Sequence, residues 1–233
     1  MSVARNVDTL ALLAAAPPRR AYAPAAARLR AAALELARER RLGDGAFSFR
    51  FVPRAEASGL LAADGPLEPL AGALPAIERL AAIVCGVCTL GPAISDCVGE
   101  LFAARRPAVA VALDELGNEL LLLLGRRAED RMLGAARRRG WNLSGELRAG
   151  DPGLRLDAQP EVLRLADAAA IGVTLTPGLL MRPLKSSTVM FGAGRGLPDT
   201  RWSRCEHCRS RARCTLHAWP TGPTPGAAPE ARA

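Results

Sequence analysis

Lysine and histidine are nearly missing from this sequence of 233 residues, in which arginine supplies almost every positive charge. Lys185 is the only lysine, and the two histidines, His207 and His217, lie close together near the carboxyl end. The net charge of +8 therefore reflects in large part a general preference for arginine over lysine, and nucleic acid is not the expected partner. Against this background, a single lysine indicates a position with a specific requirement.

Long apolar runs are also missing. The longest blocks, 80–87 and 120–124, are short or interrupted compared with the roughly 18 to 20 apolar residues of a membrane span, so no span is predicted. The apolar segment 10–16 follows Asp8 and is not followed by a clear cleavage site, which predicts a short helix ending at Pro17 rather than a signal peptide. Six cysteines, three of them clustered beside the histidines, favour a reducing compartment over a disulfide framework. We therefore expect a cytoplasmic protein.

The length of the chain and its 49% hydrophobic content predict one large domain with appendages, and hydrophobic periodicity indicates that it contains both helices and strands. Phe47, Phe49 and Phe51 alternate with other residues, as in a strand that buries one face. The apolar run 80–88 is typical of a strand covered on both faces. Pro107 begins the longest expected helix, which extends to Arg139. Other helices are expected at 25–41, from Pro92 and at 160–169. Two further strands are expected at 171–176 and 187–192. The segment 53–76 is expected to form a loop with short helical pieces, and 141–153 a polar loop or twisted strand.

The strongest local motif is a Cys/His cluster with the spacing C-x2-C-x5-C-x2-H, formed by Cys205, Cys208, Cys214 and His217. Two cysteines separated by two residues can direct both thiolates at one ion, and a third thiolate and an imidazole would complete a tetrahedral zinc site. The three thiolates could equally hold an iron-sulfur cluster with a fourth ligand. The alternative is an arginine-rich, weakly ordered tail with reduced thiols. A minor hypothesis is an arginine-rich zinc protein that contacts nucleic acid.

Cys85 and Cys88 repeat the C-x2-C spacing, but within the predicted strand 80–88. Residues three apart in a strand point to opposite faces, so these two thiols do not converge on one ion. We expect Cys85, Cys88 and Cys97 to be buried apolar residues.

A small-ligand site is predicted from Arg148 in a glycine-rich segment and from Lys185, Ser186 and Ser187. Glycines at 150 and 153 allow the backbone to approach a ligand closely, and a guanidinium can bind a carboxylate through two hydrogen bonds. An arginine in such a surface loop is more often solvated, so the motif alone does not decide between a ligand-binding and a solvated arginine.

Three blocks in order, 88–102, 110–121 and 171–194, resemble the activation domain of vitamin B12-dependent methionine synthase in its short, free-standing form. They are similar to the family's T-x-G turn and helix, its LD-x-x-G helix, and its IGV-x-LT strand followed by the KS-x-S turn, in which Lys185 matches the lysine. Small family members also end in a cysteine-rich tail.

The resemblance implies an α+β fold: a C-shaped domain with a central, mainly antiparallel sheet flanked by helices. It implies a site for S-adenosylmethionine and a partner that carries cobalamin, which is remethylated while an electron donor reduces the cobalt. Arg148, Pro152 and Gly153 match residues of the family's R-x-x-PGY loop, although the loop in this sequence is one residue longer and Leu154 stands in place of the tyrosine. The sequence contains no D-x-H-x-x-G cobalamin motif.

The expected organisation is an activation-like domain at 1–199, a metal-binding tail at 200–220 and a disordered tail at 221–233. The first functional hypothesis is an accessory domain that assists a separate corrinoid protein or corrinoid methyltransferase. It would act by S-adenosylmethionine-dependent reductive methylation or by electron delivery through the metal centre. The second is a non-catalytic module that has the same fold, a degenerate ligand loop and a zinc or iron-sulfur tail, and that binds a corrinoid protein.

Overall fold

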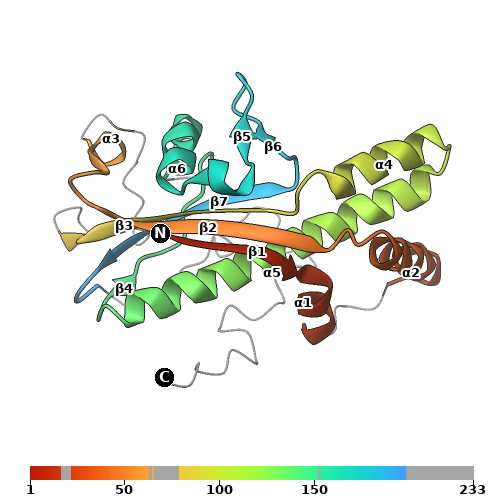
Figure 1. Cartoon of the computed structure of the whole chain (residues 1–233), viewed down its shortest axis with the longest axis horizontal. Coiled ribbons are helices and arrows are strands. Elements are labelled where there is room, and N and C mark those ends of the chain that lie inside the picture. Colours follow the sequence, from red (N-terminus) through yellow and green to blue (C-terminus); the bar gives the residue numbers. More distant parts are fainter. Residues whose placement is uncertain (17–21, 63–64, 66–78, 152, 198–233) are drawn as a thin grey trace.

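A five-stranded antiparallel sheet with helices on both faces forms the centre of the molecule in the computed structural model (Figure 1). The structure describes residues 1–16, 22–62, 65, 79–151 and 153–197. The strand order is β1 (Ser2–Asp8), β2 (Asp44–Pro53), β3 (Ala82–Thr89), β7 (Ser186–Gly194) and β4 (Asn142–Leu143), and each neighbouring pair is antiparallel. The predicted α+β class, with an antiparallel sheet flanked by helices, is confirmed.

β3 is the middle strand, and all eight of its residues are buried. Its side chains alternate between two hydrophobic clusters, one on each face of the sheet. Val84 and Cys88 belong to the first cluster, and Ile83, Cys85 and Val87 belong to the second. The prediction that Cys85 and Cys88 are buried on opposite faces is therefore confirmed.

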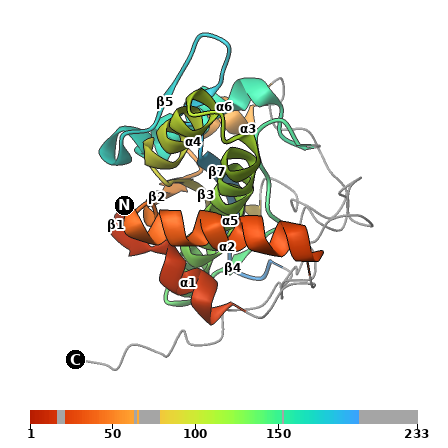
Figure 2. The same ribbon diagram turned by 90° about the vertical axis from the view of Figure 1, so that its right-hand side faces the viewer.

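The longest helix, α5 (Pro107–Arg137), covers the first face of the sheet (Figures 1 and 2). It begins at the predicted Pro107, which occupies the first turn, where a missing backbone N–H has no cost. Its buried leucines at 113, 116, 120 and 124 keep the spacing of three and four that the sequence predicts. α5 also packs against the helices α1 (Thr9–Ala15), α2 (Pro24–Glu39) and α4 (Ala93–Ala103).

The second face is covered by α6 (Gln159–Leu165), the 3-10 helix η3 (Ala168–Ile171) and the short α3 (Ser58–Leu61) (Figure 1). A further 3-10 turn, η2 (Leu156–Ala158), leads into α6. A small hairpin of β5 (Thr174–Leu175) and β6 (Met181–Arg182) follows η3 and leads to β7. The chain therefore forms three layers, with helices on each side of the sheet.

Several predicted elements differ from the structure. β1 was not predicted, and it forms an edge strand that pairs with β2. The strand predicted at 171–176 is wrong for its first residues: Ile171 ends η3, and Gly172 adopts φ 72°, so only Thr174–Leu175 is extended. The helix predicted at 160–169 ends at Leu165, because Asp167 adopts φ 55° and interrupts it. The tails predicted at 200–220 and 221–233 lie outside the described residues, so this division stays a prediction.

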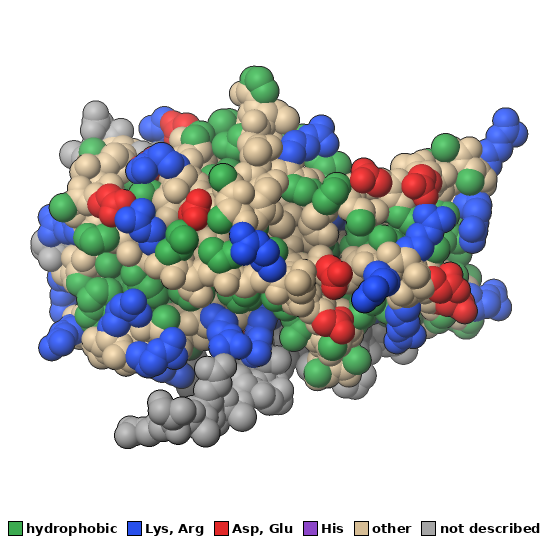
Figure 3. Space-filling view, in the orientation of Figure 1, with side chains coloured by type: hydrophobic (Ala, Val, Ile, Leu, Met, Phe, Trp, Pro, Cys, Tyr) green, Lys and Arg blue, Asp and Glu red, His purple; other side chains and the backbone are tan. Residues whose placement is uncertain are grey.

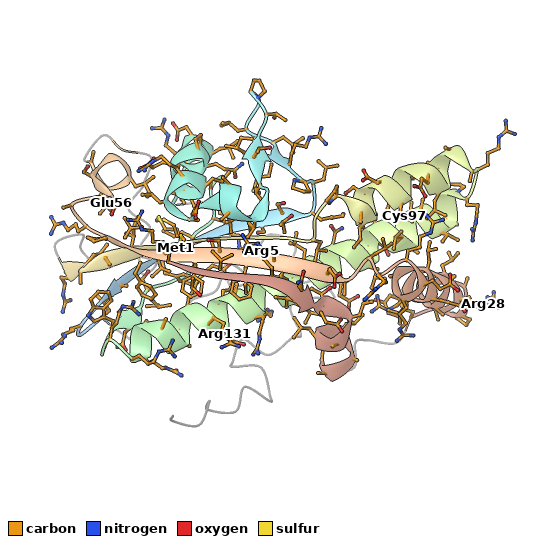
Figure 4. All side chains as sticks on the ribbon, in the orientation of Figure 1. Met1, Arg5, Arg28, Glu56, Cys97 and Arg131 are labelled. Carbon is orange, nitrogen blue, oxygen red and sulfur yellow. The ribbon has the colours of Figure 1, made fainter. Side chains whose placement is uncertain are left out.

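In the part of the chain that the structure describes, no helix has the length and apolar character needed to cross a membrane. On the face shown in Figure 3, arginine side chains are interspersed with acidic and apolar ones. Cys97 lies on α4 (Figure 4) and is buried, as predicted.

Two glycines of α5 provide a matched test of its packing. A Cβ at Gly117 would lie 3.0 Å from Ile94 Cγ2 and 3.2 Å from Lys185 Cε, whereas at Gly134 the nearest atom, Arg138 Nη1, is 3.7 Å away. Gly134→Ala is expected to raise the free energy of unfolding by up to about 1 kcal/mol through helix propensity. Gly117→Ala is expected to lower it by about 1 kcal/mol, because the crowding outweighs this gain. Urea denaturation of both variants checks the prediction, and equal effects would contradict it.

Candidate functional site

The three sequence blocks meet at the point where β3 ends and β7 begins. The Ser186 hydroxyl lies 2.8 Å from Thr89 Oγ1 and 2.7 Å from the Pro183 carbonyl oxygen. Gly91 N donates to Thr89 Oγ1 at 3.1 Å, and Leu90 N donates to the Lys185 carbonyl at 2.9 Å. The turn after β3 and the turn before β7 are therefore joined by both backbone and hydroxyl hydrogen bonds.

Lys185 crosses from this turn to α5. Its Nζ lies 2.7 Å from Asn118 Oδ1 and 2.7 Å from Asp114 Oδ1, and only 9% of its side chain is exposed. Its Cε lies against Gly117, where any larger residue would crowd it. Lys185 thus connects the third sequence block to the second through an ion pair in which the lysine is buried and the Asp114 carboxylate is half-exposed.

Arg148 forms a separate cluster on the same side of β7. Its Nε donates to Glu146 Oε1 at 2.5 Å and its Nη2 to Glu129 Oε1 at 3.0 Å. Its Nη1 donates to Ser187 Oγ at 2.5 Å and to the Thr188 carbonyl at 3.0 Å. Because a guanidinium has five N–H donors, these four contacts occupy most of its capacity. Arg148 is therefore an internally bonded side chain rather than a solvated one.

Two sequence positions explain how this cluster forms. Glu146 and Arg148 are two residues apart in an extended segment whose Leu147 pairs with Met190 of β7, so both charged side chains point to the α5 side. Glu129 projects from α5 beside the helix's buried stripe. A small cavity next to the cluster has room for about one water molecule and is lined by Cys88, Gly125, Glu129, Arg148 and Ser187 among others.

Burial shifts the pKa values of two ionisable groups here, Glu129 and Cys88. Burial, and next the nearby Glu146 carboxylate, raise the pKa of Glu129 to about 7, although Arg148 acts in the opposite direction. Burial also raises the pKa of the Cys88 thiol to about 12. At neutral pH, Cys88 is therefore an unreactive thiol, and Glu129 is divided between its acid and carboxylate forms.

The glycine-rich loop turns tightly next to Arg148. Asp151 N donates to the Arg148 carbonyl at 3.0 Å, Gly150 N donates to the Leu154 carbonyl at 2.9 Å, and both Gly150 and Gly153 have positive φ. Leu154, at the position of the family's tyrosine, is 1% exposed and belongs to the hydrophobic cluster under α6. Its side chain is thus part of the core.

The predicted site residues fall into two groups within the structure. Arg148 and Ser187 contact each other, while Lys185 and Ser186 belong to the neighbouring turn. Pro152 and the cluster of Cys205, Cys208, Cys214 and His217 lie outside the described residues. Within the described ranges, no group of three or more His, Cys, Asp or Glu side chains could hold a metal ion.

Sequence reasoning did not identify the partners of either cation. Asp114 lies inside the LD-x-x-G block, so its pairing with Lys185 could have been found by relating the two blocks. Glu146 and Arg148 are two residues apart, and in an extended segment this spacing indicates that both side chains point to the same side. Glu129 had no such signal, because its contact depends on how α5 lies across the sheet.

The raised pKa of Glu129 predicts a pH-dependent stability. The folded protein holds this proton more tightly than the unfolded chain, whose glutamate titrates near the ordinary value of 4.5. The free energy of unfolding should therefore fall as the pH rises from about 4.5 through 7. At higher pH, Glu129 no longer contributes to its pH dependence. Denaturation of the protein and of Glu129→Gln between pH 5 and pH 8 measures this. The variant should show a flatter profile, and identical slopes would exclude Glu129 as the source.

The fold is similar to that of a solved structure described as the MetH reactivation domain bound to AdoHcy. The TM-score is 0.60 over 84% of this chain and 80% of that chain, with 12% sequence identity. No family model matches the sequence, and no curated protein matches it. The chain shares the fold of the MetH reactivation domain.

Proposed function

We propose that this chain is a cytoplasmic accessory domain that binds S-adenosylmethionine and assists the reductive remethylation of a corrinoid on a separate protein. In that reaction a one-electron donor reduces the cobalt of cob(II)alamin, and the cobalt then takes the methyl group from the sulfonium sulfur, leaving methylcobalamin and S-adenosylhomocysteine. The observation that carries the proposal is the fold. Over most of both chains, it is shared with a reactivation domain solved with AdoHcy bound.

The residues near Arg148 fit the amino-acid end of such a ligand in their chemistry. Arg148 already binds a carboxylate, that of Glu129, and the Ser187 hydroxyl lies beside it. The tight turn at Gly150 and Gly153 follows Arg148 directly in the chain, and its Asp151 N donates to the Arg148 carbonyl at 3.0 Å. In this proposal Arg148 orients the ligand, while the Lys185 and Ser186 contacts keep the adjoining turn in position.

A second candidate is a non-catalytic module that binds a corrinoid protein. Two observations favour it: Leu154 is buried in the core where the family's loop carries a tyrosine, and the Arg148 donors are largely occupied by this chain's own side chains. In this case the fold would serve as a docking surface without a bound nucleoside.

Calorimetry with S-adenosylhomocysteine, followed by an anaerobic methyl-transfer assay, separates the two candidates. The assay supplies S-adenosylmethionine, a one-electron reductant and a corrinoid protein in the cob(II)alamin state. Saturable binding together with formation of methylcobalamin supports the first candidate. Association with the corrinoid protein, but no nucleoside binding and no methyl transfer, supports the second. Absence of both interactions excludes both.

The cysteine-rich segment leads to a prediction about metal content. If Cys205, Cys208, Cys214 and His217 ligate zinc or an iron-sulfur cluster, protein purified without oxygen should contain bound zinc, or iron with a brown absorbance. Cys208→Ser should lose most of that metal because it removes one of the thiolates. Cys97→Ser, which changes a buried cysteine of α4, is the matched control and should retain the metal. Equal metal content in both variants, or none in the parent protein, would reject the assignment.

A further inference from the structure

Arg148 is a cation whose surroundings already contain more negative than positive charge. Two carboxylates, Glu146 and Glu129, bind one guanidinium, so the ionised cluster carries an excess negative charge. An incoming carboxylate would meet this charge as well as occupied N–H donors. A ligand can therefore use Arg148 only if one of the two glutamates gives way.

The two glutamates are held differently. Glu146 lies 2.5 Å from Nε, is 13% exposed, and sits two residues from Arg148 in the same paired segment. Glu129 lies 3.0 Å from Nη2, is 24% exposed, and belongs to a different element, α5. It also lines the small cavity, which has room for about one water molecule. The longer, more exposed and less constrained contact is the one that can be exchanged.

We infer that Glu129 occupies the place of the ligand's carboxylate on Arg148, and that a ligand binds by displacing it. This inference rests on the proposed function, because it assigns the acid end of the ligand to the Nη2 side of Arg148. Glu129 is then a positioning residue that determines when Arg148 is available. Glu146, Ser187 and the Thr188 carbonyl keep the guanidinium in place while the exchange occurs.

Burial and the charged groups around Glu129 together determine how it titrates. Glu146 and Asp130 oppose its ionisation, Arg148 and Arg126 favour it, and Cys88 on the β3 side stays a neutral thiol at neutral pH. Burial, which is the largest cause, and then Glu146 raise the pKa of Glu129 to about 7, so protonation removes the excess negative charge near that pH. Affinity for a carboxylate ligand should therefore increase as the pH falls from 8 to 6.

The test is calorimetric titration with S-adenosylhomocysteine at pH 6 and pH 8, using the full chain and two variants. Glu129→Gln keeps the size of the side chain but removes the charge. Glu115→Gln, at an exposed position of the same helix, makes the same change away from the cluster. At pH 8 the first variant should bind about tenfold more tightly than the parent protein, as removal of a nearby like charge implies. Its affinity should be nearly independent of pH, whereas Glu115→Gln should resemble the parent protein.

The outcomes distinguish the inference from the function it rests on. If the parent protein binds and Glu129→Gln binds equally or more weakly, the displacement of Glu129 is wrong and the proposed function stands. Binding by Glu129→Gln alone would support the inference and show that the parent site is closed by its own glutamate. If no protein binds at either pH, both the inference and the nucleoside-binding function are rejected. Thermal denaturation of each variant verifies that it is folded.

Discussion

Arg148→Met is expected to lower the free energy of unfolding by about 3–5 kcal/mol at pH 8, the usual cost of removing one member of a buried ion pair. The substitution leaves Glu129 and Glu146 facing each other in a largely buried site, without the guanidinium that joins them. The loss therefore comes mainly from the stranded carboxylates rather than from the lost contacts. Urea denaturation measures it directly.

A matched arginine and a compensating variant make this prediction specific. Arg155→Met removes a half-exposed arginine that pairs with Asp157, and should cost less than about 1 kcal/mol. Combining Arg148→Met with Glu129→Gln and Glu146→Gln should recover much of the lost stability, since no buried charge then lacks a counter-charge. A small loss for Arg148→Met, or no recovery in the triple variant, would show that the cluster is solvated.

Lys185→Arg is expected to destabilise the protein by about 2 kcal/mol, although arginine is the basic residue used everywhere else. The lysine stem passes Gly117 in close contact, and its ammonium finds two acceptors, Asp114 and Asn118. A planar guanidinium is wider than an ammonium, so it would crowd the helix where the lysine stem now passes Gly117.

An arginine-to-lysine substitution at an exposed position supplies the control. Arg182→Lys, at an exposed position of β6, should alter the free energy of unfolding by less than about 0.5 kcal/mol. Thermal and urea denaturation of both variants compare the two sites. If Lys185→Arg is as stable as the parent protein, the close packing at Gly117 does not explain why this chain keeps a single lysine.

Sequence patterns were sufficient where a single element determines the outcome. The almost continuous apolar run at β3 implied burial on both faces, and strand geometry then placed Cys85 and Cys88 in different layers. Pro107 and the leucine spacing located α5 to within a few residues. β1 was missed because Arg5 and Asn6 interrupt its apolar residues, and its pairing with β2 contains an irregularity between Ala4 and Val7.

The candidate site was only partly predictable for a similar reason. Lys185 and Arg148 could be selected from the sequence, but their partners lie on α5, 67 and 19 residues away along the chain. Whether Asp114 or Glu129 faces β7 depends on the rotation of a long helix against the sheet. Periodicity defines the buried stripe of such a helix, but it does not say which polar residue beside the stripe meets a given cation.

The opposite placement of Cys85 and Cys88 makes the central strand a built-in reporter of local opening. Burial raises the pKa of each thiol to about 12, so in the folded protein neither presents an appreciable thiolate to an alkylating reagent. Each becomes reactive only when its own layer separates from the sheet. Cys85 lies under α6 and Cys88 under α5. The alkylation rates of the two thiols would therefore measure separately how often each helical layer opens from the sheet.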